Sequence, residues 1–353
     1  MQSLIVFAPN VGGGGGLVLL RELLRAEWLG MKLTAILDRR GQSGISDVVQ
    51  DWDVHWVDSS IGGRWRAETL LAQLAGPDEA VLCFHNLPPV VARGGRIFCF
   101  VQNANLVGLI PTSHLSGWLR LRYAVERFIA RRFRRRVERY MVQTPTMAAA
   151  LSDWYGAGVP PIDILPFVVG EHLKPAAQSS AMGERRWDFI YVSDGSFHKN
   201  HRRLFEAWQM LAVQNVFPTL AVTLHPERDA LLRAELKGLV DRFGLRIEDL
   251  GQIPHGEVLE NYRRSGALIF PSYAESFGIP LVEAMSAGLP IVASETDYVR
   301  DLCDPATTFD PFSPRSIARA VRRFLRLPSE HVTLISADAF GAALRERVEA
   351  GKS

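Results

Sequence analysis

Residues 267–294 are ALIFPSYAESFGIPLVEAMSAGLPIVAS, and this stretch predicts a strand, a loop, a short helix and a second strand. The continuous apolar run over 267–270 is typical of a buried parallel strand. Pro280 suits the first turn of a helix, and Gly288 suits the position just after its last turn. Because the helix between them is apolar nearly all round, we expect it to be buried.

Two carboxylates flank the glycine turn of this stretch. Glu283 lies in the helix expected to be buried, where a carboxylate without hydrogen-bond donors is costly and sugar hydroxyls would serve. Glu275 lies in the preceding loop, whose backbone N–H groups near Gly278 are at the positive end of the helix dipole and suit an anion. The stretch therefore predicts a site for an anion that carries hydroxyls. Pairing of Glu283 with an internal arginine or lysine is the alternative.

The composition is that of an ordinary globular chain. The 353 residues suggest two domains, and the formal net charge of +2 gives no reason to expect nucleic acid binding. Three cysteines follow no metal-ligand spacing, and Cys83 and Cys99, which lie inside apolar runs, are expected to be buried reduced thiols. The apolar run over 4–8 has no basic residue before it and predicts a first strand. The reduced thiols favour a cytoplasmic location. No apolar run is long enough to predict a span of a bilayer.

Strand and helix patterns alternate along both halves of the chain, which implies two parallel sheets covered by helices. An irregular, polar stretch separates the halves and predicts a linker. We therefore expect a Rossmann-like domain over 1–168, a linker over 169–187, a second Rossmann-like domain over 188–328 and helices over 329–353.

The first half offers a glycine loop and several polar strand ends. The five glycines of Gly12–Gly16 let a large group approach the backbone closely. They miss the G-x-G-x-x-G spacing, so a nicotinamide or flavin site with Asp38 on a ribose is an alternative interpretation. His85 follows an expected strand, at the crevice of an open α/β sheet, and a histidine hydrogen-bonded within a loop is its alternative. Other polar residues at such strand ends are Asn86, Gln102, Asn103 and Asn105.

Two basic features stand out. Residues 115–140 predict a long helix in which arginines alternate with aromatic and apolar side chains. Such a helix suits an anionic membrane surface, and a core helix with a solvated arginine face is the alternative. Lys199 stands just before a second expected helix, where a cation disfavours the helix itself. The position makes sense if both face an anion, so Lys199 is predicted to bind phosphate, with an exposed loop lysine as the alternative.

With these residues placed, the chain resembles the retaining glycosyltransferases of family 4. Their GT-B fold has two Rossmann-like, parallel-sheet α/β domains that face each other across a cleft. The segment from Phe270 to Val292 carries the resemblance, because Glu275 and Glu283 match the E-x7-E signature of that family. Lys199 resembles its phosphate-loop lysine, and Gly12–Gly16 resembles its N-terminal glycine loop.

The resemblance implies transfer of a hexose, with retention of anomeric configuration, from a nucleotide-sugar to a glycan or lipid-linked acceptor. Cell-surface polysaccharide synthesis, such as that of lipopolysaccharide or capsule, is the implied setting, with no cofactor and no metal. Glu275 and Lys199 would be catalytic, and Glu283 would hold the ribose. The other donor-binding residues would be Ser276, Phe277, Gly278, His198 and Asn200. The residues on the acceptor side or in the cleft would be Gly13, Gly14, His85, Gln102 and Asn103. The N-terminal domain would bind the acceptor, the C-terminal domain the donor, and the last helices would cross back.

The chain departs from that family at two places. Ser193 and Asp194 stand where such sequences commonly carry a glycine and an arginine, and Gln102 stands where a histidine often follows the strand. Three interpretations remain. The first is a glycosyltransferase, cytoplasmic or peripheral on the inner face of the membrane. The others are an NAD(P)- or flavin-dependent oxidoreductase and a GT-B-like binding protein without turnover, which Asp194 favours.

Overall fold

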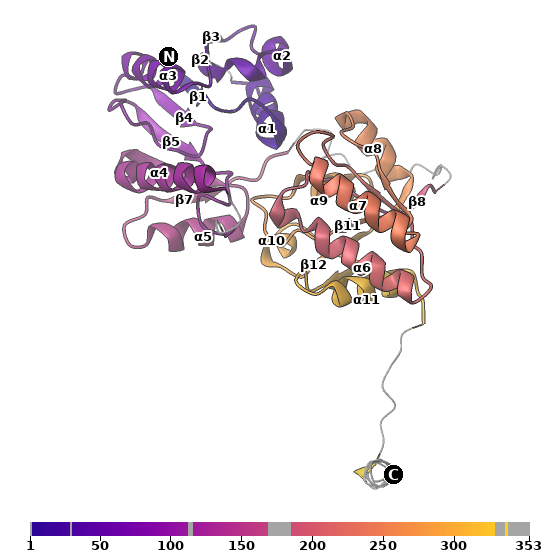
Figure 1. The fold of residues 1–353 in the computed structure, drawn as a ribbon. Coiled ribbons are helices and arrows are strands. Elements are labelled where there is room, and N and C mark those ends of the chain that lie inside the picture. The colour runs from indigo at the N-terminus through magenta and orange to yellow at the C-terminus, as the bar shows by residue number, and fades with distance from the viewer. Residues whose placement is uncertain (1, 29, 112–115, 169–184, 329–335, 338–353) are drawn as a thin grey trace.

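The computed structural model describes residues 2–28, 30–111, 116–168, 185–328 and 336–337. These residues form two parallel β-sheets, each with its own helices (Figure 1). The fold class predicted from the alternation of strands and helices is therefore confirmed. The greater part of the expected linker over 169–187 and of the helices expected over 329–353 lies outside the described residues.

The first sheet has seven parallel strands in the order β3-β2-β1-β4-β5-β6-β7. The order reverses next to β1, so the loops that follow β1 and β4 leave the sheet in opposite directions and open a crevice between them. Its strands are β1 (Gln2–Ala8), β2 (Met31–Asp38), β3 (Asp53–Val57), β4 (Ala80–Cys83), β5 (Arg96–Phe100), β6 (Val137–Val142) and β7 (Ile162–Ile164). Its helices are α1 (Gly14–Arg25), α2 (Gln42–Ile45), α3 (Ile61–Leu74), α4 (Gly117–Phe133) and α5 (Pro145–Tyr155).

The second sheet has six parallel strands in the order β10-β9-β8-β11-β12-β13. Its two central strands are buried except at Asp188, as is typical of parallel strands covered on both faces. Its strands are β8 (Trp187–Tyr191), β9 (Leu220–Val222), β10 (Ile247–Asp249), β11 (Ser265–Phe270), β12 (Ile291–Ser294) and β13 (Thr307–Phe309). Its helices are α6 (His201–Val213), α7 (Ala230–Phe243), α8 (His255–Arg263), α9 (Ile279–Ser286), α10 (Asp297–Arg300) and α11 (Pro314–Phe324).

The stretch over 267–294 folds into the predicted strand, loop, helix and strand, but the helix is buried over only part of its surface, since Met285 is 39% exposed. β11 is buried at every position, and α9 buries Leu281, Val282 and Ala284 against the sheet. Pro280 lies in the first turn of α9, where its missing N–H costs no hydrogen bond. Gly278 caps this helix with φ 85°, a left-handed conformation that favours glycine. The glycine therefore allows the chain to turn from the loop after β11 into α9.

The two sheets lie next to each other and touch through their helices (Figure 1). The backbone N–H of Thr146, in α5, donates to the Asp301 carboxylate beside α10 at 2.8 Å. Ile279 of α9 packs with the core beneath α1, and an added Cβ on Gly15 would lie 3.2 Å from Ile279 Cδ1. These contacts bring the start of α9 against α1 and set the width of the space between the sheets. Within the described part of the chain, no helix combines the length and apolarity that a bilayer span requires.

Candidate functional site

A cavity of about 540 Å³ lies between the two sheets. One wall comes from α1 and from the loops after β4, β5 and β6, and the other from the loops after β8 and β11 and the start of α9. These loops all follow strands at their carboxyl ends, which is where open α/β sheets bind ligands. Of the residues predicted for the site, those that line the cavity are His198, Lys199, Glu275, Ser276, Phe277, Gly278, Glu283, Gln102 and Asn103.

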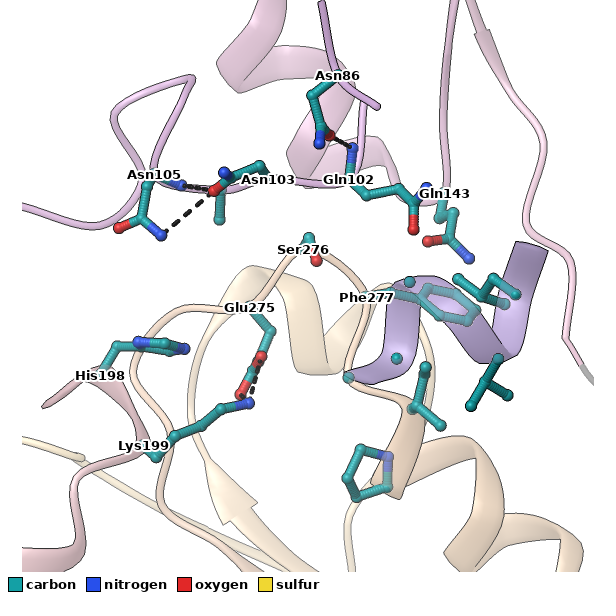
Figure 2. Close-up of a pocket in the computed structure, with 18 of the residues that line it drawn as sticks. Asn86, Gln102, Asn103, Asn105, Gln143, His198, Lys199, Glu275, Ser276 and Phe277 are labelled. Carbon is teal, nitrogen blue, oxygen red and sulfur yellow. Dashed lines mark hydrogen bonds and ion pairs between the residues drawn. The ribbon is translucent and has the colours of Figure 1, made fainter. Parts of the chain in front are cut away.

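Lys199 and Glu275 meet at the centre of the second wall (Figure 2). Lys199 Nζ lies 2.7 Å from Glu275 Oε1 and 2.9 Å from Oε2, and the two side chains are 17% and 9% exposed. The two residues are far apart in sequence but lie close together, because they follow β8 and β11, which are neighbours in the sheet. The structure thus places the two predicted catalytic residues in direct contact, as a bidentate ion pair on the cavity wall.

The backbone around Lys199 is held from several sides. Lys199 ends a single 3₁₀ turn, Phe197–Lys199, and its carbonyl accepts a hydrogen bond from the Tyr191 hydroxyl at 2.8 Å. The backbone N–H of Tyr273 donates to the His198 carbonyl at 3.1 Å. These bonds tie the lysine turn to β8 and to the Glu275 loop. The geometry of the ion pair is therefore set by main-chain contacts rather than by two flexible side chains alone.

Asn200 corrects one donor-binding prediction. It is buried, has φ 65°, and its Nδ2 donates to the carbonyls of Pro271 at 3.0 Å and Pro311 at 2.7 Å. Its side chain is consumed in these bonds and is not among the groups that line the cavity. Asn200 joins the lysine turn to the loop after β11, so it positions Lys199 rather than contacting a ligand there.

Glu283 lies in α9, deeper in the same wall. It is 5% exposed, and the Tyr262 hydroxyl donates to its Oε2 at 3.1 Å. Burial raises the pKa of the Glu283 carboxyl to about 7, against a smaller lowering effect of the Tyr262 hydrogen bond. A carboxylate in this environment gains from additional hydroxyl donors, because they replace the water that it loses on burial.

Asp194 lies next to the lysine turn but not on the cavity surface. Burial would raise the pKa of its carboxyl, but the hydrogen bonds from Ser196 and the charges of Lys199 and Arg228 lower it on balance. The Ser196 N–H donates to Asp194 Oδ1 at 3.0 Å, and an Arg228 nitrogen lies 3.9 Å from Oδ2. Asp194 is thus an anion near the predicted phosphate site, which adds negative potential where family resemblance expects a cation.

The first-sheet wall presents a row of carboxamides. Figure 2 shows Gln102, Asn103 and Asn105 on the opposite side of the cavity from the ion pair. Asn103 Oδ1 accepts hydrogen bonds from the Asn105 N–H at 3.0 Å and from its Nδ2 at 3.2 Å. The row is completed by Asn86, whose Oδ1 accepts from the Gln102 N–H, and by Gln143. Gln143 directly follows β6, and this position at a strand end is the signal by which sequence could have found it.

His85 corrects a second prediction. It is 1% exposed and does not line the cavity. Its Nδ1 lies 3.1 Å from the Phe7 carbonyl and its Nε2 lies 2.8 Å from an Arg64 nitrogen. Because an arginine only donates, Nε2 accepts and Nδ1–H donates, which is a neutral imidazole. Burial, followed by the Arg64 charge, holds the pKa of His85 well below its usual value.

The glycine loop reaches the cavity at a slightly later position than predicted. Gly15 and Gly16, in the first turn of α1, line the cavity, whereas Gly13 and Gly14 do not. Gly13 is the residue that precedes the helix, and Gly14 has φ 66° at its first position. The reason is that α1 begins inside the glycine run. Gly15 and Gly16 of its first turn therefore face the cavity, and the glycines before them do not.

Comparison with known proteins adds a family match. The family model described as "Glycosyl transferases group 1" matches residues 175–340, which include Lys199, Glu275 and Glu283. "O-antigen chain mannosyltransferase B" of Escherichia coli is 28% identical over 143 residues, 39% of this chain and 36% of that protein. "D-rhamnosyltransferase WbpZ" of Pseudomonas aeruginosa is 27% identical over 149 residues, 40% of this chain and 37% of that protein. Each alignment thus spans little more than a third of the relative's own length.

A solved structure covers almost the whole chain. HepE of Anabaena, in complex with UDP-glucose, superposes with a TM-score of 0.65 at 15% identity, covering 92% of this chain and 90% of that one. The chain therefore has the GT-B fold, as the resemblance in sequence implied. Its C-terminal half is similar to the group 1 glycosyl transferases, and its assignment to family 4 stays a prediction.

Proposed function

We propose that this protein transfers a hexose, with retention of anomeric configuration, from a nucleotide-sugar to a glycan or lipid-linked acceptor in cell-surface polysaccharide synthesis. The observation that carries the proposal is the grouping of Lys199, Glu275, Glu283 and the start of α9 around one cavity. The match to glycosyl transferases group 1 over these residues and the similarity to O-antigen sugar transferases support it.

The donor fits the second wall by its chemistry. Its diphosphate would meet the Lys199 ammonium and the backbone N–H groups at the positive end of α9. Glu283 would accept hydrogen bonds from the ribose hydroxyls, and Glu275 from hydroxyls of the transferred sugar. His198 would add a neutral donor beside the diphosphate, because burial lowers the pKa of its imidazole.

The reaction breaks the bond between the anomeric carbon and the phosphate oxygen and forms a bond from that carbon to the acceptor oxygen. Negative charge grows on the departing phosphate, where Lys199 and the start of α9 stabilise it. Positive charge grows on the sugar, beside the Glu275 carboxylate. The departing phosphate oxygen takes the proton from the acceptor hydroxyl, on the same face of the sugar that it leaves. The step therefore balances without a protein base, a cofactor or a metal.

The first wall suits the acceptor. Carboxamides both donate and accept hydrogen bonds, so they match sugar hydroxyls. The described residues of this wall that line the cavity carry no charged side chain. We therefore propose that the end of the acceptor which enters the cavity is an uncharged sugar.

The alternative of a dinucleotide cofactor has less support. Asp38, which would bind a ribose, is buried, and its Oδ2 accepts a hydrogen bond from an Arg40 nitrogen at 2.6 Å. Its carboxylate is thus already paired, and Asp38 does not line the cavity. The third interpretation, a binding protein without turnover, differs from the proposal in activity alone and is separated from it by assay.

We test the proposal by thermal-shift screening against UDP-, GDP- and ADP-sugars, followed by an assay of donor hydrolysis and transfer with the sugar nucleotide that binds. A stabilised protein that releases nucleoside diphosphate supports a transferase, and proton NMR of the product reports the anomeric configuration. Activity that persists in EDTA is expected of a transfer without a metal. Binding without turnover would favour the silent binding protein, and no binding of any sugar nucleotide would refute the proposal.

We further propose that α4 docks on an anionic membrane. The helix presents an exposed apolar ridge, with Trp118 72% and Phe128 67% exposed, and Arg132 and Arg135 are exposed near its C-terminal end. The ridge consists of Trp118, Leu121, Val125 and Phe128, which follow helical spacing on one face. Apolar insertion beside cations is the chemistry that binds anionic bilayers.

The other arginines of this segment divide between structure and surface. Arg127 donates to the Asn105 and Leu106 carbonyls, so it holds the loop after β5 in place. Arg136 donates to the carbonyls of Pro89, Val90 and Ala92. The helix predicted over 115–140 is shorter in the structure, because α4 ends at Phe133 and β6 begins at Val137. It is not the core helix of the alternative either, since Ala130 is its buried residue. The membrane proposal rests on the ridge and the exposed arginines beside it.

Vesicle sedimentation tests this second proposal. We expect binding to phosphatidylcholine vesicles that contain phosphatidylglycerol, and little to phosphatidylcholine alone. The double variant Trp118→Ser with Phe128→Ser should lose this binding. The control pair Ile61→Ser with Trp65→Ser removes exposed apolar side chains from α3 and should keep it. Equal loss in both pairs, or binding that ignores lipid charge, would contradict a role of α4 at an anionic surface.

A further inference from the structure

The ion pair of Lys199 and Glu275 has a consequence for how the nucleotide leaves. The lysine ammonium has three N–H donors, and both Glu275 oxygens lie within hydrogen-bond distance of Nζ, at 2.7 and 2.9 Å. Both side chains are largely buried, so water screens the pair weakly. A diphosphate that binds Lys199 therefore competes with a carboxylate fixed at contact distance.

The surroundings offer little other positive charge to a diphosphate. Among the described residues that line the cavity, Lys199 carries the positive charge. His198 does not add to it, because burial lowers the pKa of its imidazole and favours the neutral form. Asp194 adds negative charge close by, since its hydrogen bonds and neighbouring cations hold its pKa low despite burial. Arg228 is 62% exposed and lies within 3.9 Å of Asp194 and of Asp229, so its charge is shared with two carboxylates.

We propose that Glu275 competes with the nucleoside diphosphate for Lys199 and thereby speeds release of the product. This inference rests on the proposed function. While the sugar is attached to the nucleotide, its hydroxyls donate to Glu275 and compensate the carboxylate for the loss of Lys199. Once the sugar has passed to the acceptor, the nucleoside diphosphate offers Glu275 no such donor. The Glu275 carboxylate then pairs with the Lys199 ammonium again, and the diphosphate loses its cation.

This role makes a prediction that a static structural ion pair does not. Removing the charge of Glu275 should weaken catalysis, as for any residue that contacts the sugar, yet tighten binding of the product. An ion pair that only holds the loop in place would, on removal, loosen the site and weaken binding of the product and of the donor together.

The test is a double-mutant cycle read by calorimetry, with UDP, GDP and ADP titrated into the wild-type protein to find the one that binds. For that nucleotide we expect Glu275→Gln to lower Kd about tenfold, about 1.4 kcal/mol. Lys199→Met should raise Kd, and adding Glu275→Gln to it should give little further change, because the competition needs the lysine. The control Glu235→Gln removes the same charge from an ion pair with Arg202 outside the cavity and should leave Kd unchanged.

Steady-state inhibition gives a second readout. In Glu275→Gln, the inhibition constant of the nucleoside diphosphate should fall relative to KM for the donor. An unchanged or higher Kd for the nucleotide in Glu275→Gln would overturn the inference while leaving the proposed function intact. If Glu275→Gln lowered the Kd of the nucleotide equally in the Lys199→Met background, Glu275 would act by direct repulsion of the diphosphate. That result would also overturn the inference. Failure of every nucleotide to bind the wild-type protein would instead refute the proposed function.

Discussion

Glu283→Gln should stabilise the protein in a manner that depends on pH. The folded pKa of Glu283 is raised by burial to about 7 from its ordinary value of 4.5. A raised carboxyl pKa means that the folded state holds the proton more tightly than the unfolded chain. The resulting stability is fully present below pH 4.5 and is lost as pH rises through about 7. Above that range the folded protein must hold an ionised carboxylate in a buried helix.

The size of the effect follows from the shift. At about 1.4 kcal/mol for each unit of pKa, the free energy of unfolding of the wild type falls by about 3 kcal/mol across this window. Glutamine has nearly the same shape and can still accept the hydrogen bond that Tyr262 donates. It has no proton to lose, so the variant escapes this loss. We expect it to melt about 5 °C above the wild type at pH 8.5 and at a similar temperature at pH 5.

The assay compares melting temperatures of the two proteins by fluorimetry across this pH range. Taking their difference cancels the titration of all other groups, including the buried His201, whose pKa burial lowers to about 4. Glu206→Gln, at an exposed position of α6, is the matched control and should show no such trend. A difference between Glu283→Gln and wild type that is the same at every pH, or that favours the wild type at high pH, would refute the reasoning. A nucleotide that donates hydroxyls to Glu283 should stabilise the wild type more than the variant at pH 8.5.

Three further variants test separate parts of the structure. Lys199→Ala should reduce turnover by roughly 10²–10³, as loss of one preorganised donor to a developing anion does, and near-normal turnover in a transfer assay would remove Lys199 from the site. Gly195→Ala should weaken nucleotide binding, because its Cβ would lie 2.7 Å from Asp229 Cγ and push the lysine turn; calorimetry that gives the wild-type Kd would contradict this. Glu68→Ala should lower the melting temperature by several degrees, since it removes the ion pair of the buried Glu68 with Arg64 and leaves two backbone N–H groups without their acceptor. Because Glu68 lies outside the cavity, nucleotide binding at low temperature should survive, and loss of binding without loss of stability would count against a structural role.

Local patterns in the sequence were sufficient for the fold. β11 and α9 are short and buried, and their apolar runs, with Pro280 and Gly278 at the helix start, leave few other conformations open. Parallel strands that alternate with helices admit few arrangements, because crossover connections are short and right-handed.

Side-chain partners at the site were less predictable because they depend on contacts between distant segments. Sequence placed His85 at a strand end, but it could not show that Arg64, one helix away, lies within 2.8 Å and occupies its ring nitrogen. Asn200 stands beside Lys199 in sequence, yet its left-handed backbone turns the amide towards Pro271 and Pro311. In both cases a residue distant in sequence forms a hydrogen bond with the side chain, and the local sequence pattern does not show this.

The two carboxylates of the E-x7-E pattern differ because a loop and a helix place them in different environments. Glu275, in the loop, reaches across to Lys199, whereas Glu283, in α9, faces the Tyr262 hydroxyl inside the domain. When a phosphate binds Lys199, Glu275 loses its cation and can accept hydrogen bonds from sugar hydroxyls instead. A buried carboxylate such as Glu283, whose pKa burial raises, gains from hydroxyls that donate to it. Under the proposed function, the two carboxylates would bind different parts of the donor, Glu275 the reacting sugar and Glu283 the ribose.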